Sequence, residues 1–128
     1  RIDDLIEAFW PGPLTLILNS NPDLPKHLNN NSGTLAVRFS SSAVVQRLIE
    51  LGEYPLIGTS ANMSGLHSCT TADEVAIQLK DDVDIVIDGC KRSENLASTI
   101  VHCLTEPFKI VRQGSISLKA LNQICKVQ

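Results

Sequence analysis

Apolar residues recur along the chain at two spacings, and the spacing separates predicted helices from predicted strands. In "RIDDLIEAFW" (residues 1–10) they lie on one helical face. The prolines of "WPGPL" end this helix, because proline lacks an amide hydrogen and restricts the residue before it. The runs "LTLILNS" and "TLAVRF" (34–39) predict two strands. Turn-forming residues fill the stretch between them (20–33), which predicts a surface loop with room for one helical turn.

The rest of the chain continues this alternation of helices and strands. "SSSAVVQRLIELG" starts with capping serines and ends on Gly52, and it predicts the clearest helix. "PLIG" predicts the next strand, and Thr71 with Glu74 forms a capping box that opens the helix "ADEVAIQLKDD". "DIVIDG", "STIVHCL" and "FKIVRQG" predict three further strands, and Ser117 caps a last amphipathic helix.

Together these elements predict one α/β domain with a mixed sheet that helices cover. Strands and helices alternate in the middle of the chain, whereas the later strands follow one another directly. No cap residue and no initiator methionine precedes the first helix. We therefore expect residues 1–128 to form a single domain that is incomplete at its N-terminus.

The composition agrees with a soluble globular domain. The 128 residues are 43% hydrophobic and 20% charged, which is enough apolar material for a core. The apolar runs are too short to span a bilayer, and no charged-then-apolar leader opens the chain. We expect a cytoplasmic protein without membrane contact.

Cysteine spacing and net charge narrow the possible functions. The four cysteines (Cys69, Cys90, Cys103 and Cys125) are too far apart for zinc-binding pairs, and the three histidines are scattered, so we expect no metal site. Cys103 and Cys125 fall on apolar faces, where a reduced thiol behaves as a small hydrophobic group. With a net charge of −3, the protein as a whole does not attract nucleic acid. Any anionic ligand must therefore be held by a local arrangement of side chains and backbone groups.

The segment "GTSANMSG" (58–65) follows a predicted buried strand and carries three hydroxyls, one carboxamide and two glycines. A serine nucleophile at Ser60 would need the G-x-S-x-G elbow, but Asn62 stands where the second glycine is required. The S-D-N-like "SAN" lacks the S-x-x-K and K-T-G partners of penicillin-binding enzymes. Two interpretations stay open: a cradle for phosphate or carboxylate oxygens, and an ordinary tight turn.

Polar residues also lie at the ends of predicted strands. Arg38 lies in "TLAVRF", Arg112 ends "FKIVR", and Ser98 with Thr99 opens "STIV". A single arginine of this kind is typical of an edge residue whose charged end reaches water. Several such residues together favour a shared anion-binding site.

Six segments resemble, in their order and near their spacing, the motifs of the YrdC/TsaC-type threonylcarbamoyl-AMP synthases: "FWPGPLTLIL", "TLAVRF", "PLIGTSANMSG", "IVIDG", "STIV" and "IVRQGSIS". The resemblance covers the C-terminal two-thirds of that family's YrdC-like domain, whose fold is a twisted mixed sheet with helices covering it. The family's N-terminal motifs, which resemble PTDTVYGL and a K-x-R element, would precede Arg1. We therefore expect this chain alone to be inactive.

The resemblance implies a nucleotidyltransferase of tRNA modification, an L-threonylcarbamoyladenylate synthase. Its substrates would be ATP, L-threonine and bicarbonate, and Mg²⁺ would bind to ATP without a ligand from the protein. No side chain would act as a catalytic group. The partner would be the tRNA threonylcarbamoyl-transfer machinery. By matching positions, the resemblance assigns ATP to Thr34, Ser60, Asn62, Ser68 and Arg112. It assigns threonine to Arg38, Gly58 and Ser98.

The sequence also departs from the family and leaves two alternatives. Ser40, Ser42 and Ala43 replace the proline and histidine-proline that usually follow the arginine, Cys90 replaces a second glycine, and Ala97 precedes the serine. The first alternative is a YrdC-like module that binds double-stranded RNA or tRNA, although the cluster of aspartates in residues 81–88 opposes it. The second is the carbamoyl-transfer domain of a hydrogenase-maturation protein, which shares the fold.

Overall fold

The computed structural model describes residues 1–89 and 97–128, so Cys90 lies outside the described residues. The described chain forms two compact units. Residues 1–45 and 97–128 form the first, which we call the sheet unit, and residues 46–89 form the second, which we call the helical unit. No helix of the described residues is long and apolar enough to cross a membrane.

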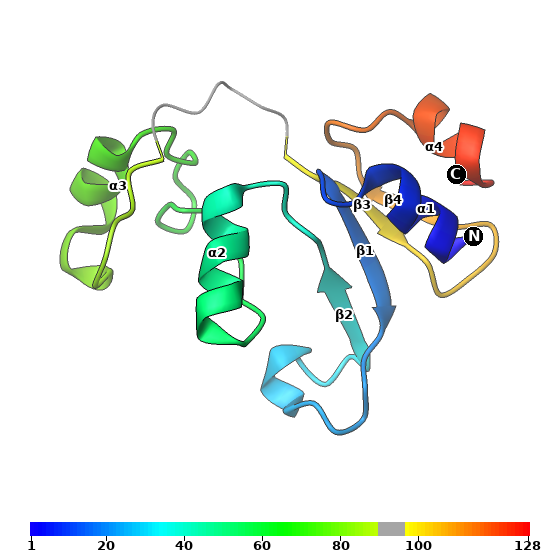
Figure 1. Ribbon diagram of the computed structural model, residues 1–128, viewed down its shortest axis with the longest axis horizontal. Coiled ribbons are helices and arrows are strands. Elements are labelled where there is room, and N and C mark those ends of the chain that lie inside the picture. Colours follow the sequence, from blue (N-terminus) through cyan, green and yellow to red (C-terminus); the bar gives the residue numbers. More distant parts are fainter. Residues whose placement is uncertain (90–96) are drawn as a thin grey trace. The chain divides into compact units, whose positions relative to one another are not determined.

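The sheet unit contains a four-stranded sheet in the order β2-β1-β3-β4 (Figure 1). Its strands are β1 (Leu14–Asn19), β2 (Thr34–Val37), β3 (Thr99–His102) and β4 (Lys109–Arg112). β1 pairs with β3 in parallel, and the other two pairings are antiparallel. The predicted mixed sheet is therefore confirmed.

One face of this sheet packs against α1 (Ile2–Phe9) and α4 (Leu118–Ile124), drawn in blue and red in Figure 1. Successive side chains of a strand point to opposite faces, so every second residue enters the core. The fully buried members come from both helices and two strands: Leu5, Leu14, Leu16, Val101 and Leu121. The predicted first and last helices are confirmed, and the Ser117 hydroxyl accepts a hydrogen bond from the Ala120 amide at 3.2 Å.

The two cysteines predicted on apolar faces lie in this core. Cys103 is buried, and Cys125 packs against the same cluster. Both are free thiols. Burial raises the pKa of the Cys103 thiol to about 11, so at neutral pH it is an uncharged, apolar group.

The residues between the core positions point away from α1 and α4, and we call the surface they form the second face. Strand register and alternation assign to it Thr15 and Ile17 of β1, Thr34 and Ala36 of β2, and Ile100 and His102 of β3. These side chains are partly or largely exposed. The second face is therefore where strand residues can meet a ligand.

The helical unit contains α3 (Ala72–Leu79), a short 3-10 helix (Lys80–Asp82) and most of α2 (Ala43–Gly52). The Thr71 hydroxyl accepts a hydrogen bond from the Glu74 amide at 3.2 Å, which confirms the predicted start of α3. The Glu74 carboxylate accepts from the Thr70 amide at 2.7 Å, one residue earlier than a capping box requires. In the sheet unit, the loop 20–33 holds the expected single helical turn (Lys26–Leu28).

Two predicted strands do not form. "PLIG" and residues 84–89 have no strand partner among the described residues, and their apolar side chains are exposed, with Ile57 80% and Ile85 79% accessible. An apolar run predicts burial, but a strand also requires a second backbone to complete its hydrogen bonds. Neither run has such a partner within the described part of the chain, so both predictions were wrong for this structure.

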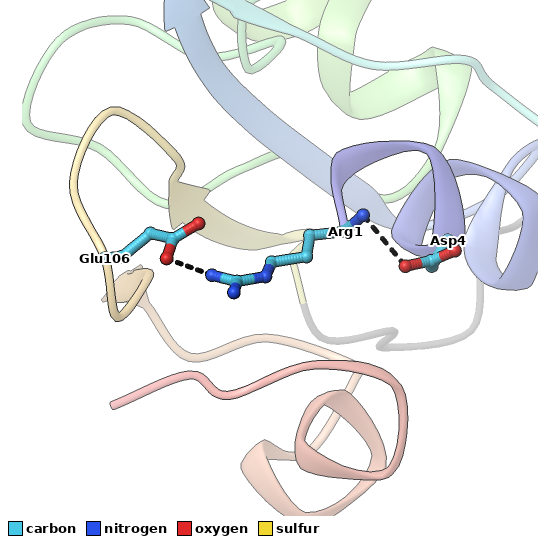
Figure 2. A network of polar contacts seen from close by, with 3 residues as sticks. All are labelled: Arg1, Asp4 and Glu106. Carbon is cyan, nitrogen blue, oxygen red and sulfur yellow. Dashed lines mark ion pairs between the residues drawn. The ribbon is translucent and has the colours of Figure 1, made fainter.

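Exposed ion pairs join the first residue to its neighbours in the sheet unit. The Arg1 amino group lies 2.8 Å from the Asp4 carboxylate, and the Arg1 guanidinium pairs with Glu106, as Figure 2 shows. These side chains are about 60% exposed. Water therefore screens the ion pairs, and they contribute little to the free energy of unfolding.

Candidate anion-binding site at one end of the sheet

Three of the predicted ligand residues lie at the same end of the sheet. Arg38 follows the last residue of β2, Ser98 precedes β3, and Arg112 is the last residue of β4. Val37 is opposite Leu16 near the start of β1, and the antiparallel register sets Ile100, near the start of β3, opposite Arg112. We call these three residues the strand-end site.

Ser98 and Arg112 are in direct contact. Arg112 donates from Nε and Nη2 to the Ser98 carbonyl oxygen, at 3.1 and 2.9 Å, and from Nη2 to Ser98 Oγ at 3.0 Å. These bonds orient the guanidinium although the side chain is exposed. Its Nη1 has no hydrogen-bond partner among the described residues, so two N–H groups of an oriented cation are available to an anion.

A buried hydroxyl holds both strands of this contact in place. Thr99, the only fully buried polar residue of the described chain, donates to the Ile116 carbonyl at 2.8 Å. It also accepts from the amides of Gly114 and Ile116, both at 3.0 Å. A Cβ at Gly114 would lie 2.5 Å from the Ser98 carbonyl carbon, so only glycine permits this close approach. Hydrogen bonds of Thr99 therefore hold residues 114–116, which follow Arg112, against the start of β3, which follows Ser98.

Arg38 is oriented by the turn between α1 and β1. Its Nε donates to the Gly12 carbonyl at 2.8 Å, and the Gly12 amide donates to the Phe39 carbonyl at the same distance. Gly12 is buried close to Phe9, where a side chain would collide with the helix backbone. Sequence reasoning expected Arg38 inside a strand, but β2 ends at Val37, one residue earlier.

Thr34 lies at the other end of β2. It is opposite Asn19, the last residue of β1, and its hydroxyl is 3.0 Å from that of Ser32. Arg38 lies four positions further along the chain, which corresponds to about 13 Å at the usual rise per residue of a strand. The structure therefore does not bring Thr34 into contact with the strand-end site.

The remaining predicted residues belong to the helical unit, where "GTSANMSG" forms a turn held by hydrogen bonds from the Asn62 side chain. Asn62 Nδ2 donates to the carbonyls of Met63 and Leu66, at 2.9 and 3.0 Å, and Gly65 has a φ of +85°. Both amide hydrogens of Asn62 are thus used within the loop. Its Oδ1 is buried and has no hydrogen-bond partner among the described residues.

Three further predicted residues of this unit are exposed. Gly58, Ser60 and Ser68 lie on the surface, and neither serine hydroxyl has a hydrogen-bond partner within the described part of the chain. The loop is braced from α3, because Gln78 Oε1 accepts from the Met63 amide at 2.6 Å. The hydrogen bonds of Asn62 confirm that the segment forms a turn, and the cradle for an anion stays a prediction.

Sequence reasoning missed the residues that support the site. No signal in the sequence indicates these residues, because their partners are distant in sequence or depend on loop geometry; they are Thr15, Gly12, Gly114 and Gln78. The Thr15 hydroxyl lies 2.9 Å from Ser98 Oγ. Within residues 1–89 and 97–128, no three His, Cys, Asp or Glu side chains gather as a metal site would require. Two shallow hollows, one beside Phe108 and one beside Ile77, contain none of the predicted ligand residues.

The chain matches the Sua5/YciO/YrdC family model, described as "Telomere recombination", over residues 1–114. A threonylcarbamoyl-AMP synthase of Pyrococcus abyssi is 33% identical over 120 residues, which are 94% of this chain and 35% of that protein. One of Photorhabdus laumondii is 42% identical over 107 residues, which are 84% of this chain and 55% of that protein. The chain thus spans between about a third and just over half of the length of these relatives.

Solved structures show the same arrangement of elements. The crystal structure of P. abyssi Sua5 complexed with L-threonine is similar with a TM-score of 0.91 and 31% identity, covering 99% of this chain and 38% of that one. The crystal structure of E. coli YciO has a TM-score of 0.80 at 24% identity, covering 91% of this chain and 57% of that one. The second likeness concerns the fold alone.

Proposed function

Since this chain belongs to the Sua5/YciO/YrdC family, we propose that it carries the larger part of the substrate site of an L-threonylcarbamoyladenylate synthase. This enzyme would join L-threonine, bicarbonate and ATP into threonylcarbamoyl-AMP and release pyrophosphate, for the modification of tRNA in the cytoplasm. The likeness to synthases at 33–42% identity supports this reaction, and the likeness to P. abyssi Sua5, which was crystallised with L-threonine, supports the amino acid.

The single observation that carries the proposal is the oriented Arg112 beside Ser98 at the strand end that Arg38 also occupies. Threonine has a carboxylate and ATP has phosphates, and both are anions that arginine and hydroxyl donors bind well. In the proposal, Arg38, Ser98 and the backbone of Gly58 hold threonine. ATP is held by Thr34, Ser60, Asn62, Ser68 and Arg112.

This set of residues suits a reaction that needs no protein nucleophile. Bicarbonate takes up a proton and loses water to give carbon dioxide, and the threonine amine captures it as a carbamate and releases a proton. A carbamate oxygen then attacks the α-phosphorus of ATP, and the bond to pyrophosphate breaks. The protein then has to align two anions and offset their mutual repulsion, for which positioned cations and hydroxyls are sufficient.

The described residues do not fit a protein-held magnesium site, since no cluster of three ligating side chains exists among them. Magnesium bound to ATP usually keeps several waters and takes phosphate oxygens as ligands. In the proposal, Mg²⁺ therefore arrives with ATP, and none of the residue roles above depends on it.

Two variants test the proposal, one through ATP binding and the other through threonine binding. Both are made in the longest form of the protein that its gene encodes. Arg112→Ala should weaken ATP binding by about 1.5–3 kcal/mol, the range for a charge-assisted hydrogen bond, and affect threonine less. Arg38→Lys keeps the charge but loses the planar fork, so it should raise the KM for threonine and leave ATP affinity unchanged. Calorimetric titration and pyrophosphate release measure the two effects.

The same variants separate synthesis from RNA binding. Lysine preserves most of the attraction to a phosphate backbone, so an RNA surface would tolerate Arg38→Lys. A normal threonine KM together with lost RNA affinity in that variant would overturn the enzyme assignment. An unchanged ATP affinity in Arg112→Ala would reduce that residue to an exposed edge side chain held by Ser98 alone.

A further inference from the structure

Thr15 lies in β1 on the second face, next to two residues of the strand-end site. Its hydroxyl oxygen is 2.9 Å from Ser98 Oγ, and Ser98 Oγ is 3.0 Å from Arg112 Nη2. The Thr15 side chain is partly buried and has no other hydrogen-bond partner among the described residues. The three side chains form a hydrogen-bonded row that starts in the central strand of the site.

The protons in this row can be assigned from the chemistry of its members. A guanidinium only donates, so Ser98 Oγ must accept from Arg112. A serine hydroxyl has one proton and two lone pairs, and Arg112 occupies one lone pair. If Thr15 donates to Ser98, the second lone pair is occupied as well. The Ser98 proton then has no protein acceptor in the row and is available to an anion.

An anionic ligand selects this arrangement over its reverse. In the reverse arrangement Ser98 donates to Thr15 and offers a ligand only a lone pair, which a carboxylate or phosphate oxygen repels. A hydroxyl that donates to an ionised oxygen forms one of the stronger hydrogen bonds in proteins. We infer that Thr15 is a positioning residue that donates to Ser98 and so fixes the Ser98 hydroxyl as a donor to the substrate carboxylate.

This inference rests on the proposed function, because it takes threonine as the ligand of Ser98. Thr15→Val removes the hydroxyl at nearly constant volume and should raise the KM for threonine by about three- to ten-fold, the usual value of one hydrogen bond. The kcat and the ATP affinity should stay within about two-fold, because the bond acts on ground-state binding. Thr15→Ser restores the donor and should return the KM to that of the parent protein.

A double-mutant cycle shows whether Thr15 acts through Ser98. Ser98→Ala should raise the KM for threonine by itself, and adding Thr15→Val to it should cause little further change. Additive effects, or a threonine KM that Thr15→Val leaves unchanged, would overturn the inference. A loss in Thr15→Val that Thr15→Ser does not rescue would also overturn it, since the hydroxyl would not be the cause.

Arg38→Lys, measured in the same assay, separates this inference from the proposed function. If Arg38→Lys raises the threonine KM and Thr15→Val does not, only the role of Thr15 is wrong. If neither variant changes the threonine KM, threonine does not bind at this end of the sheet, and the proposed function fails with it. Should Thr15→Val fold poorly, Thr15→Ala compared with Thr15→Ser gives the same contrast between hydroxyl and no hydroxyl.

Discussion

The sheet unit and the helical unit differ in burial and in charge. Every buried residue of the described chain belongs to the sheet unit, and none of residues 46–89 is buried. The sheet unit holds seven basic and five acidic residues, whereas residues 46–89 hold two basic and eight acidic ones. The predicted ligand residues are divided between two such different surroundings.

This difference indicates what each unit can contribute to an anion site. In the sheet unit, Arg38 and Arg112 supply positive charge, and backbone and side-chain hydrogen bonds from a packed scaffold orient them. In the helical unit the surrounding charge repels anions, so Ser60 and Ser68 can act only through short-range hydrogen bonds. The sheet unit can therefore offer oriented positive charge to an anion, and the helical unit can offer neutral hydrogen-bond donors.

Truncating one apolar residue in each unit should give the largest contrast. Leu16 is fully buried, so Leu16→Ala should lower the free energy of unfolding by about 2–5 kcal/mol through lost contacts and a cavity. Ile57 is 80% exposed, so Ile57→Ala should change it by less than about 0.5 kcal/mol. Urea denaturation followed by circular dichroism measures both. Equal losses would mean that residues 55–58 are buried in solution.

Removing the Thr99 hydroxyl should give the next largest effect and connect the scaffold to the site. Thr99→Val leaves the amides of Gly114 and Ile116 without their acceptor and should cost about 2–4 kcal/mol of unfolding free energy. Thr99→Ser is the matched control, since it keeps the hydroxyl and loses one methyl group. If the two variants prove equally unstable in the same denaturation experiment, the hydroxyl is not what fastens the loop.

The smallest expected effect is a pH dependence confined to α3. Hydrogen bonds from the Thr70 amide and then the Thr70 hydroxyl lower the pKa of the Glu74 carboxyl below its ordinary value of 4.5. Its stabilising contribution is therefore complete above pH 4.5 and is lost as the pH falls through the lowered pKa. The protection factors of the α3 amides, which are the intrinsic exchange rates divided by the rates measured by NMR, should therefore fall as the pH is lowered from 6 to 3. Glu74→Gln should remove this pH dependence of the protection factors, and an unchanged profile in that variant would contradict the assignment.

The sequence by itself determined most of the local structure. Apolar spacing and capping residues predicted α1, α2, α3 and α4, and the Thr71 and Ser117 caps form as expected. Helices are predictable in this way because their hydrogen bonds and caps join residues close in the chain. The strands of the sheet unit were also predicted, and so was the position of polar residues at strand ends.

Only the tertiary structure decided which of those residues meet. The contacts of Arg38 with Gly12, of Arg112 with Ser98 and of Thr15 with Ser98 span 26, 14 and 83 residues. Apolar periodicity assigns a strand residue to a face, but it does not encode which strand lies beside it or in what register. For the same reason "PLIG" and "DIVIDG" were predicted as strands and did not form, because a strand exists only where a second backbone completes its hydrogen bonds.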